Sequence, residues 1–287
     1  MTSINLVNFF LLRIGADQLL QVLNKQLSLA TTGSQVKESP SAWANMIIST
    51  LSFTKSIFTV TGKDMGVFMD QWVRQGGHAR FQMQFVYNRK RNTVEMQINQ
   101  DAANEGARGV RKYVGPVTVA VQELDGWFSY TMAVETVRSK HDITCHSKSR
   151  RNKKKKIPLC TNEEVDMDLS AMDDSPVLWI RVDPDMQLVR SLDILQPDFQ
   201  WQYQLRHERD ITAQLEAVAA LERFPTAGSK KALVDMIEEE KCFYKVRCAA
   251  CHSLTKVTLI LIDSYFYLLS LKHGFLSLGF QCHVVVI

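Results

Sequence analysis

The spacing of the apolar residues changes twice along the chain, and this restricts the possible folds more than any other feature. Up to residue 76 the apolar residues recur at helical spacing, between 77 and 190 they alternate with polar residues, and from 191 helical spacing returns. A period near 3.6 is typical of helices that bury one face, and a period of two is typical of half-buried strands. The sequence therefore predicts an α+β multidomain chain.

The first region, residues 1–76, predicts helices at Gln18–Ser28, Ser41–Phe58 and Met65–Arg74. The polar segment Thr31–Pro40 predicts a loop between the first two helices. In the second helix we expect one face to be buried, formed by Trp43, Met46, Ile47 and Leu51. A short break with a glycine, residues 61–64, precedes the third helix.

The middle region, residues 77–190, has the alternation of an antiparallel β-sandwich. The expected strands are Ala79–Tyr87, Thr93–Gln100, Pro116–Glu123, Trp127–Val134 and Val177–Val182. Polar turns separate the first pair and the second pair, which is the signal of two β-hairpins. We expect a basic and then acidic loop within the sandwich, at about residues 140–175.

Positive charge is concentrated in this loop. Seven of the nine residues from 148 to 156 are cationic: Lys148, Arg150, Arg151, Lys153, Lys154, Lys155 and Lys156. The net charge of the whole chain is only +4, so the remainder is slightly acidic. Cations this dense cannot be buried together and favour an extended, solvated segment. Three uses remain open: a nuclear-import signal, contact with DNA phosphates, or an inert surface loop.

An acidic segment follows the basic run, from Glu163 to Asp174. Three interpretations are open for it. It folds back on the basic run, it offers the apolar side chains between its carboxylates to a partner, or it is a solvated connector.

The third region, residues 191–256, predicts the start of HEAT-like helical repeats. Two stripes of apolar residues stand on either side of Pro225, and a third helix is expected at Phe243–Lys256. Residues 257–287 form a hydrophobic tail. Its best candidate for a membrane span, Val257–Leu271, is shorter than the ~20 apolar residues required and contains Asp263, so a buried helix or an aberrant terminus is favoured. A membrane-anchored form stays open as a third possibility.

Two groups of residues resemble metal or haem motifs. His207-Glu208 begins like a zinc-peptidase motif, but Ile211 stands where the second histidine is required, and we expect the pair on the exposed face of a helix. Cys248 and Cys251 with His252 have haem-attachment spacing, and Cys242 could extend them to a zinc site. Small residues that pack against a neighbouring repeat are the favoured interpretation.

A third group, His141, Cys145, His146 and Cys160, has irregular spacing, and the basic run within it would repel a cation. Phosphate-binding glycine loops, Gly-x-Ser-x-Gly elbows and paired carboxylates are absent from the sequence. The six cysteines have no framework spacing, which favours reduced thiols in the nucleus or cytosol. We therefore expect a protein that is not an enzyme and that has no cofactor and no metal.

Several long segments resemble the TFIID subunit 2 family of TBP-associated factors. They include KYVGPVTVAVQELDG at Lys112–Gly126 and FQWQYQLRHERD at Phe199–Asp210, and the others are Lys63–Asp101, Lys140–Leu159 and Glu163–Met186. The resemblance is strong from Lys63 to Lys256 and is not seen after it. It implies a fragment with the C-terminal helices of a zinc-aminopeptidase-like domain, then the sandwich, then the repeats.

The same resemblance implies a function. The family forms a nuclear, non-enzymatic scaffold that supports assembly of the RNA polymerase II preinitiation complex. It implies TBP, other TBP-associated factors and core-promoter DNA as partners, and no small-molecule substrate. The alternative is a fragment of an active zinc aminopeptidase whose catalytic half is missing.

Overall fold

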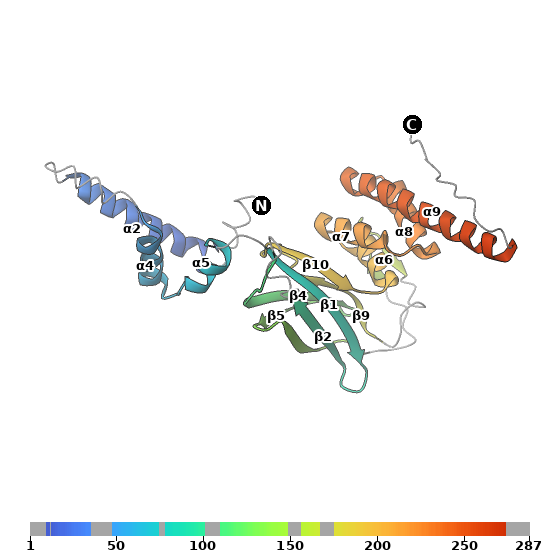
Figure 1. Cartoon of the computed structure of the whole chain (residues 1–287), viewed down its shortest axis with the longest axis horizontal. Coiled ribbons are helices and arrows are strands. Elements are labelled where there is room, and N and C mark those ends of the chain that lie inside the picture. The colour runs from blue at the N-terminus through green and yellow to red at the C-terminus, as the bar shows by residue number, and fades with distance from the viewer. Residues whose placement is uncertain are drawn as a thin grey trace. The chain divides into compact units, whose positions relative to one another are not determined.

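The computed structural model describes residues 10–11, 13–35, 48–74, 78–100, 110–148, 156–166 and 175–273. These residues form a mixed α+β structure of helices and three sheets, which confirms the predicted fold class at this level (Figure 1). The chain divides into two compact units. Unit 1 comprises residues 1–120, 127–144 and 181–195, and unit 2 comprises residues 121–126, 145–180 and 196–287.

The helices of unit 1 differ from the expected ones in their ends. Helix α2 (Ala16–Gln35) continues through five residues that were expected to be a loop. Helix α4 (Thr50–Thr61) begins nine residues after the predicted start at Ser41. The Ser49 hydroxyl caps it by accepting a hydrogen bond from Ser52 N at 3.1 Å. Gly62, with φ 69°, ends it, and α5 (Gly66–Trp72) follows.

The buried faces of these helices are narrower than the sequence indicated. Val22 of α2 and Ile57 of α4 are fully buried, whereas Leu51, expected on the buried face, is 62% exposed. Trp43, Met46 and Ile47 lie outside the described residues. Helical spacing identified the helices but not the side that each presents to its neighbour, because leucines occur around most of α2.

The larger sheet belongs to unit 1 and has the strand order β10-β1-β2-β6, with β3 also paired to β1. Its strands are β1 (His78–Asn88), β2 (Thr93–Gln100), β3 (Val110–Arg111), β6 (Arg138–Thr144) and β10 (Arg190–Leu195). The β1–β2 hairpin is confirmed, with Phe85 opposite Met96. Met83, Val94 and Ile98 are buried.

The prediction of a wholly antiparallel sandwich is wrong, because β1 pairs in parallel with β10 and with β3. A hairpin forces its two strands to be antiparallel, but a strand that arrives by a long connection can pair in either direction. Strand β10 also begins where the sandwich was expected to end, at residue 190.

The second sheet has the order β5-β4-β9. Its strands are β4 (Gly115–Glu123), β5 (Gly126–Val134) and β9 (Val177–Val182), close to the predicted ranges. Alternate residues of β4, from Val117 to Val121, are buried, and all six residues of β9 are buried. A third, two-stranded sheet pairs β7 (Lys156–Pro158) with β8 (Glu164–Asp166). Within the loop expected at about residues 140–175, β6 continues to Thr144 and the β7–β8 hairpin follows at 156–166, so the described part of this region contains strands.

Helices α6 (Asp198–His207), α7 (Ile211–Leu221), α8 (Ala227–Glu238) and α9 (Tyr244–His273) follow in unit 2 (Figure 1). Asp210 and Thr226 cap the starts of α7 and α8 with their side-chain oxygens. The predicted repeat-like helices are confirmed, and the third extends well beyond Lys256. Among the described residues, no helix combines the length and apolar composition that a membrane span requires.

Candidate functional site

The structure describes the two ends of the basic run rather than its middle. Lys148, the first residue of the run, is exposed, and so is Lys156, the last residue of the run, at the start of β7. The other predicted site residues, Arg150, Arg151 and Lys153 to Lys155, lie outside the described residues. Residues 148–156 are called the basic segment below. The structure shows how unit 2 holds each end of this segment.

A buried carboxylate holds the N-terminal end. Glu123 ends β4 and its side chain is completely buried. Its two oxygens accept hydrogen bonds from the backbone N–H groups of His146, at 3.2 Å, and Ser147, at 2.6 Å. The Ser147 hydroxyl in turn accepts from Asp125 N at 3.0 Å. Because hydrogen bonds to a carboxylate are stronger than neutral ones, this contact fixes the chain directly before Lys148.

Sequence reasoning missed Glu123, although a signal for it was present. Val117, Val119 and Val121 form the buried face of β4, and position 123 continues the same alternation. A carboxylate at a position that the alternation assigns to the interior must find hydrogen-bond donors there. That reasoning identifies Glu123 as an anchor but not the residues that it binds.

The β7–β8 hairpin holds the C-terminal end. Ile157 packs in a buried cluster with Leu178, Trp179 and Tyr203. The backbone N–H of Cys160 donates to the carbonyl oxygen of Arg206, at 2.8 Å. Both described ends of the basic segment are thus held by contacts within unit 2.

The acidic segment folds back on the C-terminal end of the basic run, because β8 pairs antiparallel with β7 and places Asp166 opposite Lys156. Glu163 Oε1 lies 2.6 Å from Lys241 Nζ, and both side chains are more than half exposed. This ion pair joins the hairpin to the turn between α8 and α9. Glu164 and Asp166 are exposed, and Asp168, Asp173 and Asp174 lie outside the described residues.

The prediction that His207 and Glu208 share the exposed face of a helix is wrong. Helix α6 ends at His207, and Glu208 has an extended backbone, because Asp210 starts a new helix two residues later. The His207 ring stacks on Trp179 at a centroid distance of 6.5 Å, and its Nδ1 lies 3.1 Å from the Pro158 carbonyl oxygen. Burial lowers the pKa of His207, which favours a neutral ring that donates to this carbonyl. His207 therefore supports the hairpin.

The cysteines of α9 also differ from expectation. Cys248 and Cys251, which were expected to pack against a neighbouring repeat, are exposed. Val246 and Ala250 are buried instead, so the face of α9 that packs is not the predicted one. Cys242 does not extend this group, because its Sγ instead lies 3.6 Å from Cys160 Sγ.

The third candidate group is dispersed as well. Cys145 is buried, and His146 Nδ1 lies 3.8 Å from Glu123. Within the part of the chain that the structure describes, no three His, Cys, Asp or Glu side chains are placed to hold a metal ion.

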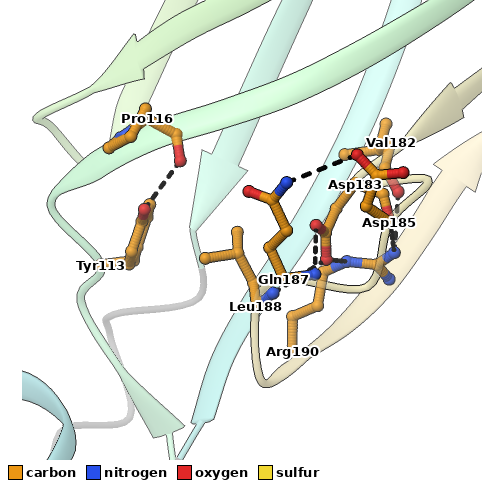
Figure 2. A network of polar contacts seen from close by, with 8 residues as sticks. All are labelled: Tyr113, Pro116, Val182, Asp183, Asp185, Gln187, Leu188 and Arg190. Carbon is orange, nitrogen blue, oxygen red and sulfur yellow. Dashed lines mark hydrogen bonds and ion pairs between the residues drawn. The ribbon is translucent and has the colours of Figure 1, made fainter. Parts of the chain in front are cut away.

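A separate polar network organises the turn between β9 and β10 in unit 1 (Figure 2). Asp183 accepts hydrogen bonds from the backbone N–H groups of Gln187, at 2.8 Å, and Leu188, at 3.1 Å, and from Arg190 Nε at 2.9 Å. The Asp183 and Arg190 side chains are 2% and 10% exposed. Burial raises the pKa of Asp183, and Arg190 opposes that shift. Both carboxylate oxygens of Asp183 accept hydrogen bonds from groups that belong to the turn or to the start of β10, so the network holds the turn in shape.

Two sheets followed by paired helices define a class of protein in which an immunoglobulin-like domain leads into helical repeats. Residues 76–197 match a family model described as the TAF2 Ig-like domain, and residues 198–284 match one described as TAF2-like, TPR repeats. The second match continues past Lys256, where the resemblance was expected to end. It names TPR rather than HEAT-like repeats, although both are stacks of helical hairpins.

The curated relatives agree with these matches. TFIID subunit 2 of Drosophila melanogaster is 63% identical over 253 residues, covering 88% of this chain and 21% of that protein. The Danio rerio protein is 54% identical over 254 residues, with 88% and 21% covered, and the Caenorhabditis elegans protein is 44% identical over 246 residues, with 85% and 22% covered. The chain belongs to the TFIID subunit 2 family, as its sequence predicted. It spans about a fifth of the length of the curated relatives it matches.

A solved structure has a similar fold. Legionella pneumophila aminopeptidase A in complex with aspartic acid superposes with a TM-score of 0.56, over 97% of this chain and 32% of the other. The sequences are only 8% identical, so this likeness concerns the fold and not the chemistry.

Proposed function

We propose that this chain is part of a non-enzymatic scaffold subunit of the general transcription factor TFIID. In this role it supports assembly of the RNA polymerase II preinitiation complex in the nucleus. The observation that carries the proposal is the 63% identity to a TFIID subunit 2 over 88% of the chain. The proposed partners are TBP, other TBP-associated factors and core-promoter DNA.

The arrangement of unit 2 supports a scaffold role. Among its described residues, Glu123 accepts hydrogen bonds from backbone N–H groups and His207 contacts a backbone carbonyl oxygen, so both side chains hold the chain in place. In the described residues, the motif that begins at His207 is divided between two helices, so it cannot place two histidines on one helical face.

The basic segment is the proposed contact for nuclear import or for DNA phosphates. Glu123 and the β7–β8 hairpin hold its ends on one unit, and both described end residues, Lys148 and Lys156, are exposed. Phosphate contacts by such a segment would give an affinity that depends strongly on salt and little on base sequence.

Affinity capture tests the scaffold role. The tagged full chain is incubated with nuclear extract, and bound proteins are identified by mass spectrometry. We expect enrichment of TBP and TBP-associated factors over a tag-only control. A soluble, folded chain that enriches none of them contradicts the proposal.

A four-lysine variant tests the basic segment. Lysines 153–156 are changed to alanine, and the control variant changes four exposed lysines elsewhere: Lys55, Lys90, Lys230 and Lys231. If the segment is an import signal, only the first variant remains in the cytoplasm. If it contacts DNA, only the first variant loses affinity for duplex DNA. Equal behaviour of both variants in both assays means that the segment is an inert surface loop.

The alternative is a fragment of an active zinc aminopeptidase, a class with which this chain shares its fold at only 8% identity. The discriminating measurement is aminopeptidase activity of the full-length protein with added zinc. Hydrolysis that is abolished by a chelator would favour the peptidase over the scaffold.

A further inference from the structure

Two thiols from distant parts of the sequence meet in unit 2. Cys160 lies in the turn of the β7–β8 hairpin, and Cys242 lies in the turn between α8 and α9, 82 residues further on. Their Sγ atoms are 3.6 Å apart. A disulfide bond is about 2.05 Å long, so the two sulfur atoms must approach by about 1.5 Å to form one.

Each thiol is held in place by its own backbone contacts. Cys160 N donates to the Arg206 carbonyl oxygen at 2.8 Å, and Cys242 N donates to the Glu239 carbonyl oxygen at 3.1 Å. The adjacent residues Glu163 and Lys241 form an ion pair between the same two turns. The folded unit therefore keeps the two sulfur atoms close together, because these three interactions fix the positions of the two turns.

We propose that Cys160 and Cys242 form an oxidisable dithiol, a modification site that a disulfide oxidant such as oxidised glutathione converts to an intramolecular disulfide. One cysteine thiolate attacks the oxidant, forms a mixed disulfide and releases one glutathione thiolate. The second cysteine, as its thiolate, then attacks the protein sulfur of that mixed disulfide and releases the second glutathione. The two cysteines lose two electrons and two protons, and one oxidised glutathione becomes two reduced molecules.

The surroundings of the site predict slow oxidation at neutral pH. Burial raises the pKa of the Cys160 thiol to about 12, and burial also raises the pKa of Cys242. Only the thiolate attacks a disulfide, so its small population limits the rate. The rate should increase about tenfold for each unit by which pH rises between 7 and 9. The site thus responds to sustained oxidation.

The disulfide would act on the basic segment. Cys160 is four residues after Lys156, and its hairpin is the C-terminal anchor of the segment. A covalent bond from the hairpin to the α8–α9 turn would restrict local opening of that anchor. We expect amide hydrogen exchange in residues 156–166 to become at least about tenfold slower on oxidation.

The test uses the full chain with Cys248, Cys251 and Cys282 changed to serine, so that these thiols do not exchange. The chain is incubated with oxidised glutathione at pH 8.5, alkylated, digested without reduction and analysed by mass spectrometry. We expect a peptide pair joined through Cys160 and Cys242, which disappears in the further variants Cys160→Ser and Cys242→Ser. Stable glutathione adducts on each cysteine, or a bond from Cys160 to Cys145 at equal yield, would overturn the proposal.

Phenylarsine oxide provides a second readout that needs no oxidation. A trivalent arsenical binds two neighbouring thiols at once, so the same triple-serine chain should take up one equivalent under native conditions. Loss of this uptake in either single variant is expected. Failure of the unsubstituted pair to bind the arsenical would show that the thiols do not meet in solution.

Discussion

Replacing Glu123 with glutamine tests how the basic segment is anchored. The substitution keeps the shape of the side chain but converts one acceptor oxygen into an NH₂ group. This group would face a backbone N–H, either that of His146 or that of Ser147, now 3.2 and 2.6 Å from the carboxylate oxygens. One buried N–H group then has no acceptor, since the side chain of Glu123 is inaccessible to water.

The expected loss of stability is the free energy of the lost hydrogen bond, reduced by the removal of a buried charge. A hydrogen bond to a charged acceptor contributes about 1.5–3 kcal/mol, and leaving a buried donor unsatisfied costs about 1–3 kcal/mol. Removing a buried charge offsets part of this. We therefore expect Glu123→Gln to destabilise the anchor by about 2 kcal/mol, and Glu123→Ala, which removes both acceptors, to destabilise it by about 3–4 kcal/mol.

The assay is native-state hydrogen exchange of the His146 and Ser147 amides, read by NMR or by mass spectrometry of short peptides. A loss of 2 kcal/mol corresponds to about thirtyfold faster exchange. Glu135→Gln, an exposed residue just after β5, is the matched control and should change exchange little. If the two glutamine variants exchange at the same rate at residues 146 and 147, the anchoring role of Glu123 is refuted.

Three other predictions follow from the same contacts. Asp183→Asn should destabilise unit 1 by about 3 kcal/mol or more in urea unfolding, because it leaves the Arg190 guanidinium buried without its counter-charge. The control Asp185→Asn, at an exposed position, should change the stability little, and equal unfolding midpoints of the two variants would contradict the prediction. The lowered pKa of His207 means that the neutral form is favoured in the folded state, so its contribution to stability is present above about pH 6.5 and is lost as pH falls below it; an NMR titration midpoint at or above 6.5 would disprove it. If the basic segment contacts DNA, changing lysines 153–156 to alanine should reduce the slope of log affinity against log salt by about 3–4, as measured by fluorescence anisotropy, and an unchanged slope would exclude phosphate contact.

The regular elements with a clean alternation could be predicted from the sequence. β2 and β9 lie at the ranges that their apolar residues indicated, since β2 pairs with β1 from Thr93 to Gln100 and all six residues of β9 are buried. Strand β6, in contrast, carries Arg138, Lys140 and Asp142 with a single buried residue, Ile143. It is a strand because β2 pairs with it, and such long-range pairing leaves no local pattern.

The candidate site could be predicted only in part. The cations of the basic segment are visible in the sequence, and the alternation of β4 marks Glu123 as buried. The residues that each anchor contacts are not visible, because the fold brings them together. Cys160 and Cys242 show this most clearly, since 82 residues separate them and neither lies in a spacing motif with the other. His207 is a further example, because it was expected on the exposed face of a helix and its ring instead stacks on Trp179, which lies far from it in the sequence.

The most direct test of the scaffold role is to precipitate TBP and to ask whether the chain is recovered with it. TBP is immunoprecipitated from nuclear extract of cells that express the tagged chain. The amount of the chain in the precipitate is compared with that of a tagged control protein of similar size and charge. The account predicts that the chain is recovered with TBP, together with other TBP-associated factors. A chain that is folded and present in the nucleus, yet is recovered no better than the control protein, would contradict the account.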